Sequence, residues 1–180
     1  MRTFLALPVP ESWIAPLERA QENLRGGRAV DADDLHLTLA FLDDQPEPAL
    51  EALHEELEAR TLFPAELTPT AYGVIGGSKA RAVVLDIRPT PALTALRDTV
   101  RRAVRAACID LPRERFRPHV TLVRHPASAP ADERLPGRLA RLGTPEMAPD
   151  MSGPVTLWSS RLTPQGPVYE VLATYPGRPA

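Results

Sequence analysis

The chain has 180 residues, of which 43% are hydrophobic and 24% charged, proportions typical of one folded domain and not of a disordered chain. Its net charge of -2 at neutral pH excludes nucleic-acid binding through bulk charge, so an anionic ligand must be held by a local cluster of basic residues. No apolar run is long enough to cross a membrane, and the first residues are too short an apolar stretch for a signal peptide, so we expect a cytoplasmic protein. The single cysteine, Cys108, excludes an internal disulfide.

In the first half of the chain, hydrophobic periodicity predicts four strands and two helices. The strands are expected near residues 3–9, 35–42, 67–75 and 81–88, with a hairpin-like turn over residues 76–80 between the last two. One helix begins near Pro16, ends at the Gly26–Gly27 pair and buries Trp13, Leu17, Ala20 and Leu24. The other helix carries Leu50, Leu53 and Leu57 on its core face.

The second half follows a similar plan. A helix from about Pro91 to Ala107 is predicted to bury Leu93, Leu96, Val100 and Val104 and to expose Arg97, Arg101 and Arg105, while Cys108 extends its apolar stripe and is expected to be buried. A strand over residues 116–124, a short helix near 131–141 and strands near 153–162 and 167–175 complete the chain. Because several strands follow one another directly, we favour an α+β fold with antiparallel sheets.

The sequence His-x-Thr-Leu occurs twice, at residues 36–39 and 119–122, and the two copies start 83 residues apart in strand-like segments. Residues two apart in a strand share a face, so each copy places an imidazole beside a hydroxyl. One copy alone would favour a structural histidine. Two copies in corresponding halves favour a duplicated lobe with the two strands facing each other.

This arrangement suits in-line attack on a phosphodiester, which needs a base at the nucleophile and an acid at the leaving oxygen on opposite sides of phosphorus. With an unperturbed pKa of ~6.5, one histidine can be neutral and the other protonated near pH 7. Each threonine hydroxyl can donate to a phosphate oxygen. A zinc site is the alternative, but Asp43, Asp44 and His125 are the only nearby candidate ligands and their spacing is unconvincing, so we expect no metal and no cofactor.

The doubled motif, within residues 36–42 and 116–124, resembles the 2H phosphoesterase superfamily. Within it, the opening residues 2–10 and the closing residues 160–169 are similar to the RNA 2',3'-cyclic phosphodiesterases, also called 2'-5' RNA ligase-like proteins. The resemblance covers nearly the whole chain. It implies a single domain over residues 1–180 with a bilobal, duplicated α+β fold, two antiparallel sheets with flanking helices, and a central cleft.

Carried over by position, the resemblance assigns His36 and His119 as the acid–base pair and Thr38, Thr121 and Arg124 as phosphate-binding residues. It implies hydrolysis of a terminal 2',3'-cyclic phosphate to a 2'-phosphate. The sequence alone does not decide which histidine is the base and which is the acid; we assign His119 as base toward water and His36 as acid toward the 3' oxygen. Arg124 has the opposite strand parity from His119, so either the strand ends before it or its side chain curls over the rim.

One residue departs from the family pattern, because Asp43 stands where the group often has glycine. Several functions remain open beside hydrolysis of RNA ends. These are reversible 2'-5' ligation, a cyclic phosphodiesterase acting on small nucleotides or ADP-ribose cyclic phosphate, and a catalytically weak protein that binds RNA ends. The expected partners are RNA termini or 2',3'-cyclic nucleotides, the expected state is a monomer, and the arginines at 113, 115 and 117 are a candidate RNA-backbone patch.

Overall fold

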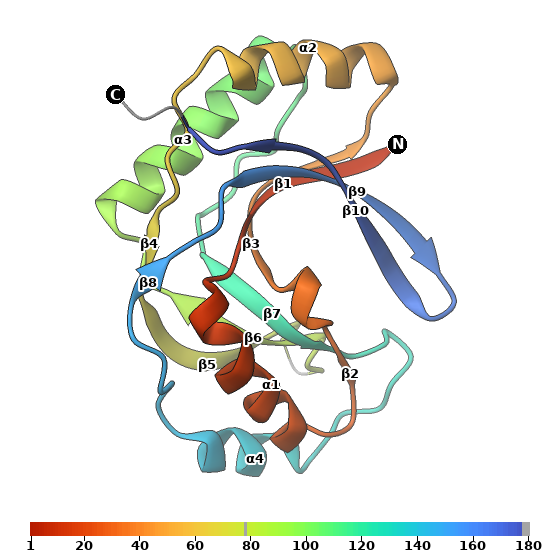
Figure 1. Cartoon of the computed structure of the whole chain (residues 1–180). Helices are drawn as coiled ribbons and strands as arrows, with labels where there is room; N and C mark the ends of the chain where they lie inside the picture. Colours follow the sequence, from red (N-terminus) through yellow and green to blue (C-terminus); the bar gives the residue numbers. More distant parts are fainter. Residues whose placement is uncertain (78, 178–180) are drawn as a thin grey trace.

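The computed structural model describes residues 1–77 and 79–177, so the predicted turn over residues 76–80 includes one residue, 78, outside the described part. Within these residues the strands are β1 (Arg2–Pro8), β2 (Arg28–Ala29), β3 (His36–Asp44), β4 (Glu66–Leu67), β5 (Pro69–Ile75), β6 (Ala82–Ile87), β7 (His119–Arg124), β8 (Asp150–Met151), β9 (Val155–Thr163) and β10 (Gly166–Tyr175) (Figure 1). The helices are α1 (Ile14–Asn23), α2 (Glu47–Glu58), α3 (Pro91–Ala106) and α4 (Leu135–Leu142). The predicted α+β fold with antiparallel strands is confirmed.

The main sheet has the strand order β10-β9-β1-β3-β7-β6-β5, and β2 pairs with β7. In its middle, β3 and β7 are joined through a single residue pair, Leu37 with Val120. Further along the same edge of β7, β2 takes the place of β3 and pairs Arg28 with Arg124. The sheet therefore consists of two parts, the β1 half-sheet (β10, β9, β1 and β3) and the β7 half-sheet (β7, β6, β5 and β2), which meet at one point.

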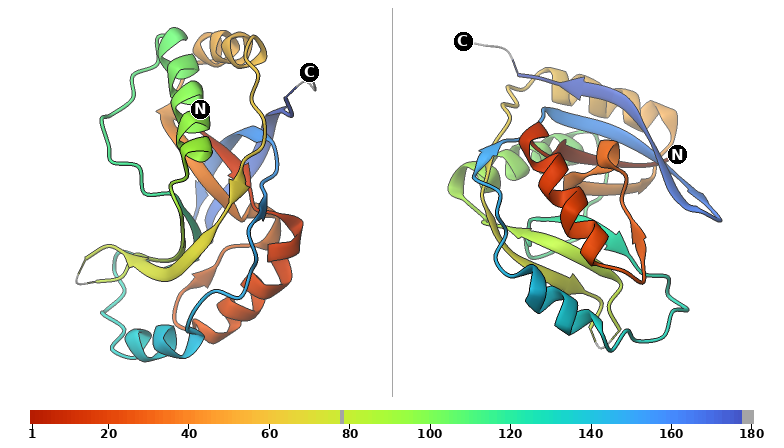
Figure 2. Two further views of the ribbon diagram at one scale, coloured as in Figure 1. Left: turned by 90° about the vertical axis from the view of Figure 1, so that its left-hand side faces the viewer. Right: turned by 60° about the horizontal axis from the view of Figure 1, so that its bottom comes forward.

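The helices cover the two half-sheets in pairs. Helices α2 and α3 pack against each other, α3 also packs against β3, and α2 packs against β10. Helix α1 packs against α4 and β7, and α4 packs against β5. Figure 2 shows the two helix pairs at opposite ends of the molecule. None of the helices in the described part of the chain is long and apolar enough to span a membrane.

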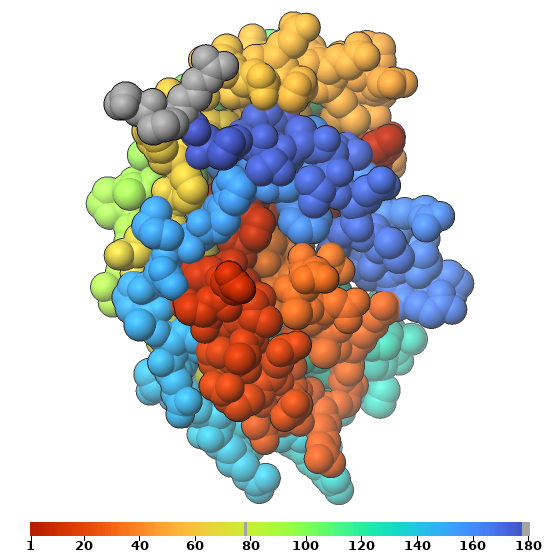
Figure 3. Space-filling model, in the orientation of Figure 1, coloured from red at the N-terminus to blue at the C-terminus, as the bar shows by residue number. Residues whose placement is uncertain are grey.

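The segment that precedes β9 packs beside α1. On the face in Figure 3, α1 (red) lies against the segment that precedes β9 (light blue). Trp13 donates its Nε1 hydrogen to the carbonyl of Ala148 at 2.8 Å, and the Gly153 amide donates to the carbonyl of Pro8 at 2.8 Å. The N-terminal segment and the segment before β9 are thus fixed to each other.

The predicted apolar faces form the core. Those fully buried or nearly so are Trp13, Leu17, Ala20, Leu24, Leu53, Leu57, Leu93, Val100 and Val104. Leu50 and Leu96 are only partly buried, near the ends of their helical faces. Hydrophobic periodicity therefore predicted the buried stripe of each long helix correctly.

The prediction for the outer face of α3 was wrong, because Arg97 and Arg101 are only 8% and 4% exposed. The loop after α3 folds back over them. Arg101 donates to the carbonyl of Pro112 at 2.6 Å, both guanidiniums approach Oε1 of Glu114 at 3.4–3.6 Å, and Arg97 stacks over the ring of Phe116 at 4.5 Å. Both charges are thus covered by loop residues and held by polar partners.

The prediction for Cys108 was also wrong, because its side chain is exposed. Helix α3 ends at Ala106, and the backbone of Cys108 is left-handed, with φ of +59°. The amide of Cys108 donates to the carbonyl of Arg105 at 3.0 Å, so this residue closes the last helical turn. The helical face on which the apolar stripe would have continued no longer exists at this position.

Candidate active site

The single pair between β3 and β7 lies at the centre of both His-x-Thr motifs. Leu37 and Val120, the paired residues, are fully buried. Side chains alternate along a strand, so the histidine and threonine on either side of each paired residue lie on the opposite face. Because the pairing is antiparallel, its register sets His36 across from Thr121 and Thr38 across from His119. Two copies of the motif thus share one face of the sheet.

Both histidine rings are held in the same way. Nδ1 of His36 lies 2.6 Å from the carbonyl oxygen of Asp34, and Nδ1 of His119 lies 2.7 Å from that of Arg117. A carbonyl oxygen only accepts, so Nδ1 is the donor in each ring and carries the proton. Nε2 is therefore the nitrogen of each neutral imidazole that can accept a proton from a ligand. In both motifs the carbonyl belongs to the residue two positions before the histidine.

The two histidines differ in environment. His36 is 8% exposed, and its ring lies 4.9 Å from that of Phe4, 5.6 Å from that of Tyr169 and 5.8 Å from that of Trp158. His119 is only partly buried. Burial, helped by the positive charges of Arg124 and His119 and opposed by the hydrogen bond to Asp34, lowers the pKa of His36 to about 4. His36 is consequently neutral at pH 7.

A β-bulge in each motif redirects the residue that follows it. Against β1, the register skips Leu39, and against β6 it skips Leu122, so the leucine of each His-x-Thr-Leu is the extra residue. One extra residue reverses the alternation of side chains beyond it. Phe41 and Arg124, each three residues after the threonine, therefore return to the face that carries the histidines.

The bulge resolves the position of Arg124. Neither expectation from the sequence was right, because β7 includes Arg124 and the backbone itself turns the side chain toward the site. The guanidinium donates to the hydroxyl oxygen of Tyr169 at 3.3 Å. The backbone of Asp43 is left-handed, with φ of +55°, which gives a physical reason for the glycine that the family resemblance implies at this position.

A cavity of about 230 Å³ opens beside this face. Its lining includes His36, Phe41, Arg124 and Tyr169, whereas Thr38, His119 and Thr121 lie outside the lining. From the sequence, the ring of Phe41 could stack on a base, but core packing was favoured; that prediction was wrong, because 54% of this side chain is exposed. Aligning the two motifs would have pointed to Phe41, because Phe41 in the first motif occupies the position of Arg124 in the second.

The comparisons with known proteins agree with this architecture. The family model described as the 2'-5' RNA ligase superfamily matches residues 8–149. An RNA 2',3'-cyclic phosphodiesterase from Thermus thermophilus is 36% identical over 97% of this chain and 89% of that protein. The crystal structure of E. coli LigT complexed with ATP aligns with a TM-score of 0.72 and 25% identity, covering 96% of this chain and 95% of that chain. This chain therefore belongs to the 2'-5' RNA ligase superfamily, and its relatives within that superfamily are RNA 2',3'-cyclic phosphodiesterases. The resemblance inferred from the sequence is confirmed.

Proposed function

We propose that this chain hydrolyses 2',3'-cyclic phosphates at RNA ends to 2'-phosphates by metal-independent acid–base catalysis with two histidines. The observation that carries the proposal is the Leu37–Val120 pair, which sets two imidazoles and two hydroxyls on one face. An approximate two-fold axis through this pair would relate the two half-sheets as lobes of a single domain, with the cleft between them. The names of the relatives supply the substrate class.

In the proposed reaction, Nε2 of His119 takes a proton from water as the water attacks phosphorus. Nε2 of His36 gives a proton to the 3' oxygen as the bond between phosphorus and that oxygen breaks, which leaves the phosphate on the 2' oxygen. The matched Nδ1 contacts to the carbonyls of Asp34 and Arg117 support these roles, because they fix both rings with Nε2 free. An in-line displacement requires the base and the acid on opposite sides of phosphorus, and one imidazole comes from each half-sheet.

For His36 to act as an acid, its ring must take up a proton from solvent when the substrate binds. In the empty cavity the ring is neutral, since burial lowers its pKa to about 4. A bound cyclic phosphate places a negative charge beside Arg124 and His36, which offsets the repulsion from Arg124 and stabilises the imidazolium. The substrate anion therefore raises the pKa of the group that protonates its leaving oxygen.

The remaining residues would position the phosphate and the nucleoside. The hydroxyls of Thr38 and Thr121 donate to the non-bridging phosphate oxygens, and Arg124 supplies a fixed positive charge held by Tyr169. The exposed ring of Phe41 lines the same cavity and provides a face on which a base can stack.

The deciding experiment measures turnover of 2',3'-cyclic AMP in the presence of EDTA by wild type, His36→Ala and His119→Ala. We expect activity in the wild type and a loss of about 100- to 10,000-fold in each variant, the usual contribution of one acid or base. Phosphorus NMR of the product is expected to show 2'-AMP alone. His54→Ala removes an exposed imidazole on α2, outside the site, and serves as the control.

Three results would contradict the proposal. The first is near-normal turnover in either site variant, and the second is loss of activity in EDTA that added zinc restores. The third is a mixture of 2'- and 3'-phosphates, which would show that the cleft does not orient the cyclic phosphate between the two rings.

A further inference from the structure

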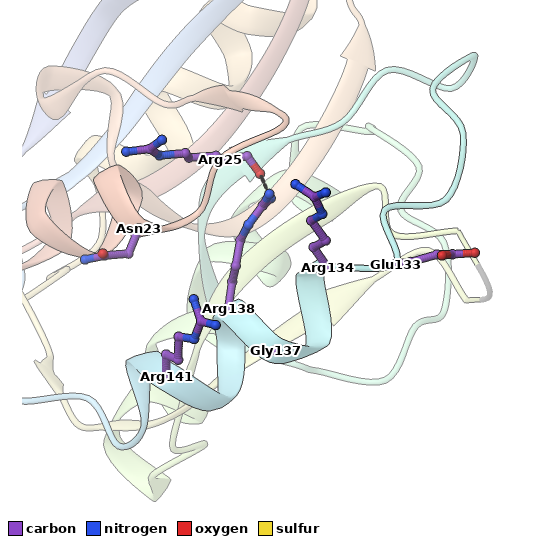
Figure 4. Close-up of a pocket in the computed structure, with 7 residues that line it drawn as sticks. All are labelled: Asn23, Arg25, Glu133, Arg134, Gly137, Arg138 and Arg141. Carbon is purple, nitrogen blue, oxygen red and sulfur yellow. Dashed lines mark hydrogen bonds between the residues drawn. The ribbon is translucent and has the colours of Figure 1, made fainter.

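Arginines gather away from the histidines, where the end of α1 meets α4. A cavity of about 680 Å³ lies there, and four of its lining residues are Arg25, Arg134, Arg138 and Arg141, here called the arginine patch (Figure 4). Glu133, the acidic residue of the lining, extends away from the arginines in Figure 4. A chain with a net charge of -2 thus concentrates positive charge in one hollow.

Helix α4 builds this patch by its spacing. Positions 134, 138 and 141 fall on one side of the helix, while Leu135 is buried. Arg138 holds the patch together, because its Nη1 donates both to the carbonyl oxygen of Arg25 and to Asp132, the latter at 2.8 Å. Among the described residues, Arg25, Arg134 and Arg141 take part in no salt bridge, and all three are exposed. Their guanidiniums are available to a ligand.

A line of arginines leads from the proposed active site toward this patch. Arg28 in β2 is the register partner of Arg124 in β7. The two also line a small hollow of about 30 Å³, and this hollow shares Arg124 and Tyr169 with the cavity at His36. Two residues lie between Arg25 and Arg28, and the three steps along the chain span at most about 11 Å. Asp31 and Asp34 also line this small hollow, so the arginines at 28 and 25 follow one another along the chain from the site toward α4 beside two acidic residues.

We propose that the arginine patch binds the sugar–phosphate backbone of RNA several nucleotides before the cyclic end. This inference rests on the proposed function and narrows the substrate to oligonucleotides. Planar guanidinium groups match phosphate oxygens in pairs. The lining of the cavity contains no aromatic side chain among the described residues, so contact with the backbone and not with bases is favoured. Single-strand sites of this type cover about 4–16 nucleotides.

The test compares two substrates, 2',3'-cyclic AMP and a single-stranded RNA octamer that ends in a 2',3'-cyclic phosphate. The patch variant is Arg134→Gln with Arg141→Gln, which spares Arg138 and its structural contacts. The control is Arg102→Gln with Arg105→Gln, which removes two exposed arginines from α3. A further variant, Arg134→Lys with Arg141→Lys, keeps the charge.

We expect the octamer to have a higher kcat/KM than cyclic AMP in the wild type, and this advantage to be lost in the patch variant. The slope of log kcat/KM against log salt concentration should become shallower by about 1.4 for the octamer, since each lost phosphate contact in a single strand contributes about 0.7. Turnover of cyclic AMP should not change in any variant, and the lysine variant should retain the salt dependence.

Several outcomes would contradict RNA binding by the arginine patch while leaving the proposed function intact. These are an octamer no better than cyclic AMP, an unchanged salt slope in the patch variant, or an equal effect of the patch variant on both substrates. Absence of turnover of either substrate by the wild type would instead reject the proposed function. In that case, fluorescence anisotropy of a 5'-labelled octamer still tests the patch, because backbone binding needs no chemistry.

Discussion

At the scale of single residues, the protonation of His36 gives the most direct test of the proposed chemistry. Its pKa is lowered to about 4 in the empty cavity, and a bound phosphate anion should raise it because the imidazolium gains an opposite charge. Binding of 2'-AMP should therefore place a proton on His36 at pH values above the pKa of the free ring. NMR titration of the His36 ring, without and with saturating 2'-AMP, measures its pKa in the free protein and in the complex.

The exposed His54 ring in the same spectra is the internal control, since it lies outside the site. Titration of His36 near 6.5 in the free protein would show that burial does not hold it neutral. An unchanged His36 pKa in the complex would show that the bound phosphate does not face this ring.

The sequence was sufficient to predict that the histidine and threonine of each motif share one face of a strand, because a doubled motif with strand spacing needs only local information. The position of Phe41 was not accessible in the same way. It depends on a bulge at Leu39, and periodicity assumes an unbroken alternation of side chains. Where a register skips one residue, every later assignment of a face is reversed.

At the scale of elements, the buried arginines of α3 hold the segment that leads to His119. Arg101 binds the carbonyl of Pro112 and the carboxylate of Glu114, and the carbonyl of Arg117 in turn holds the His119 ring. We expect Arg101→Met to lower the free energy of unfolding by about 1–3 kcal/mol, the cost of losing hydrogen bonds to a charged group. We also expect Arg101→Met to lower kcat by a larger factor than it raises KM. Urea unfolding and steady-state kinetics measure the two effects.

Arg105→Met is the matched control for this clamp, because Arg105 lies on the same helix but is exposed. Equal stability of the two variants would mean that Arg101 does not secure the loop. Reduced stability with unchanged kcat would mean that the loop does not position His119. The helical pattern could not reveal this clamp, since the covering loop has no periodicity of its own.

At the scale of the whole molecule, the chain passes repeatedly between the two half-sheets. Strand β1 belongs to one half-sheet, but α1, which follows it, packs against the other. Likewise, β6 lies in the β7 half-sheet, whereas α3, which follows it, packs against α2 and β3. The sequence predicted the elements but not these exchanges, because a helix with one apolar stripe fits either sheet. Only long-range contacts decide which sheet it covers.

This exchange of helices should make the two half-sheets unfold together. The two tryptophans lie in different clusters. Trp158 lies in β9 against Phe4, and Trp13 lies in the main core at the start of α1, which packs against β7. In Trp13→Phe the fluorescence therefore reports on the β1 half-sheet, and in Trp158→Phe it reports on the core under α1. We expect the urea transition seen by fluorescence to coincide with that seen by far-UV circular dichroism in each variant. Comparing two probes within one variant removes the effect of the substitution itself. If the half-sheets are independent, the fluorescence of one variant will change at a lower urea concentration than its dichroism, because one half-sheet will melt while the other stays folded.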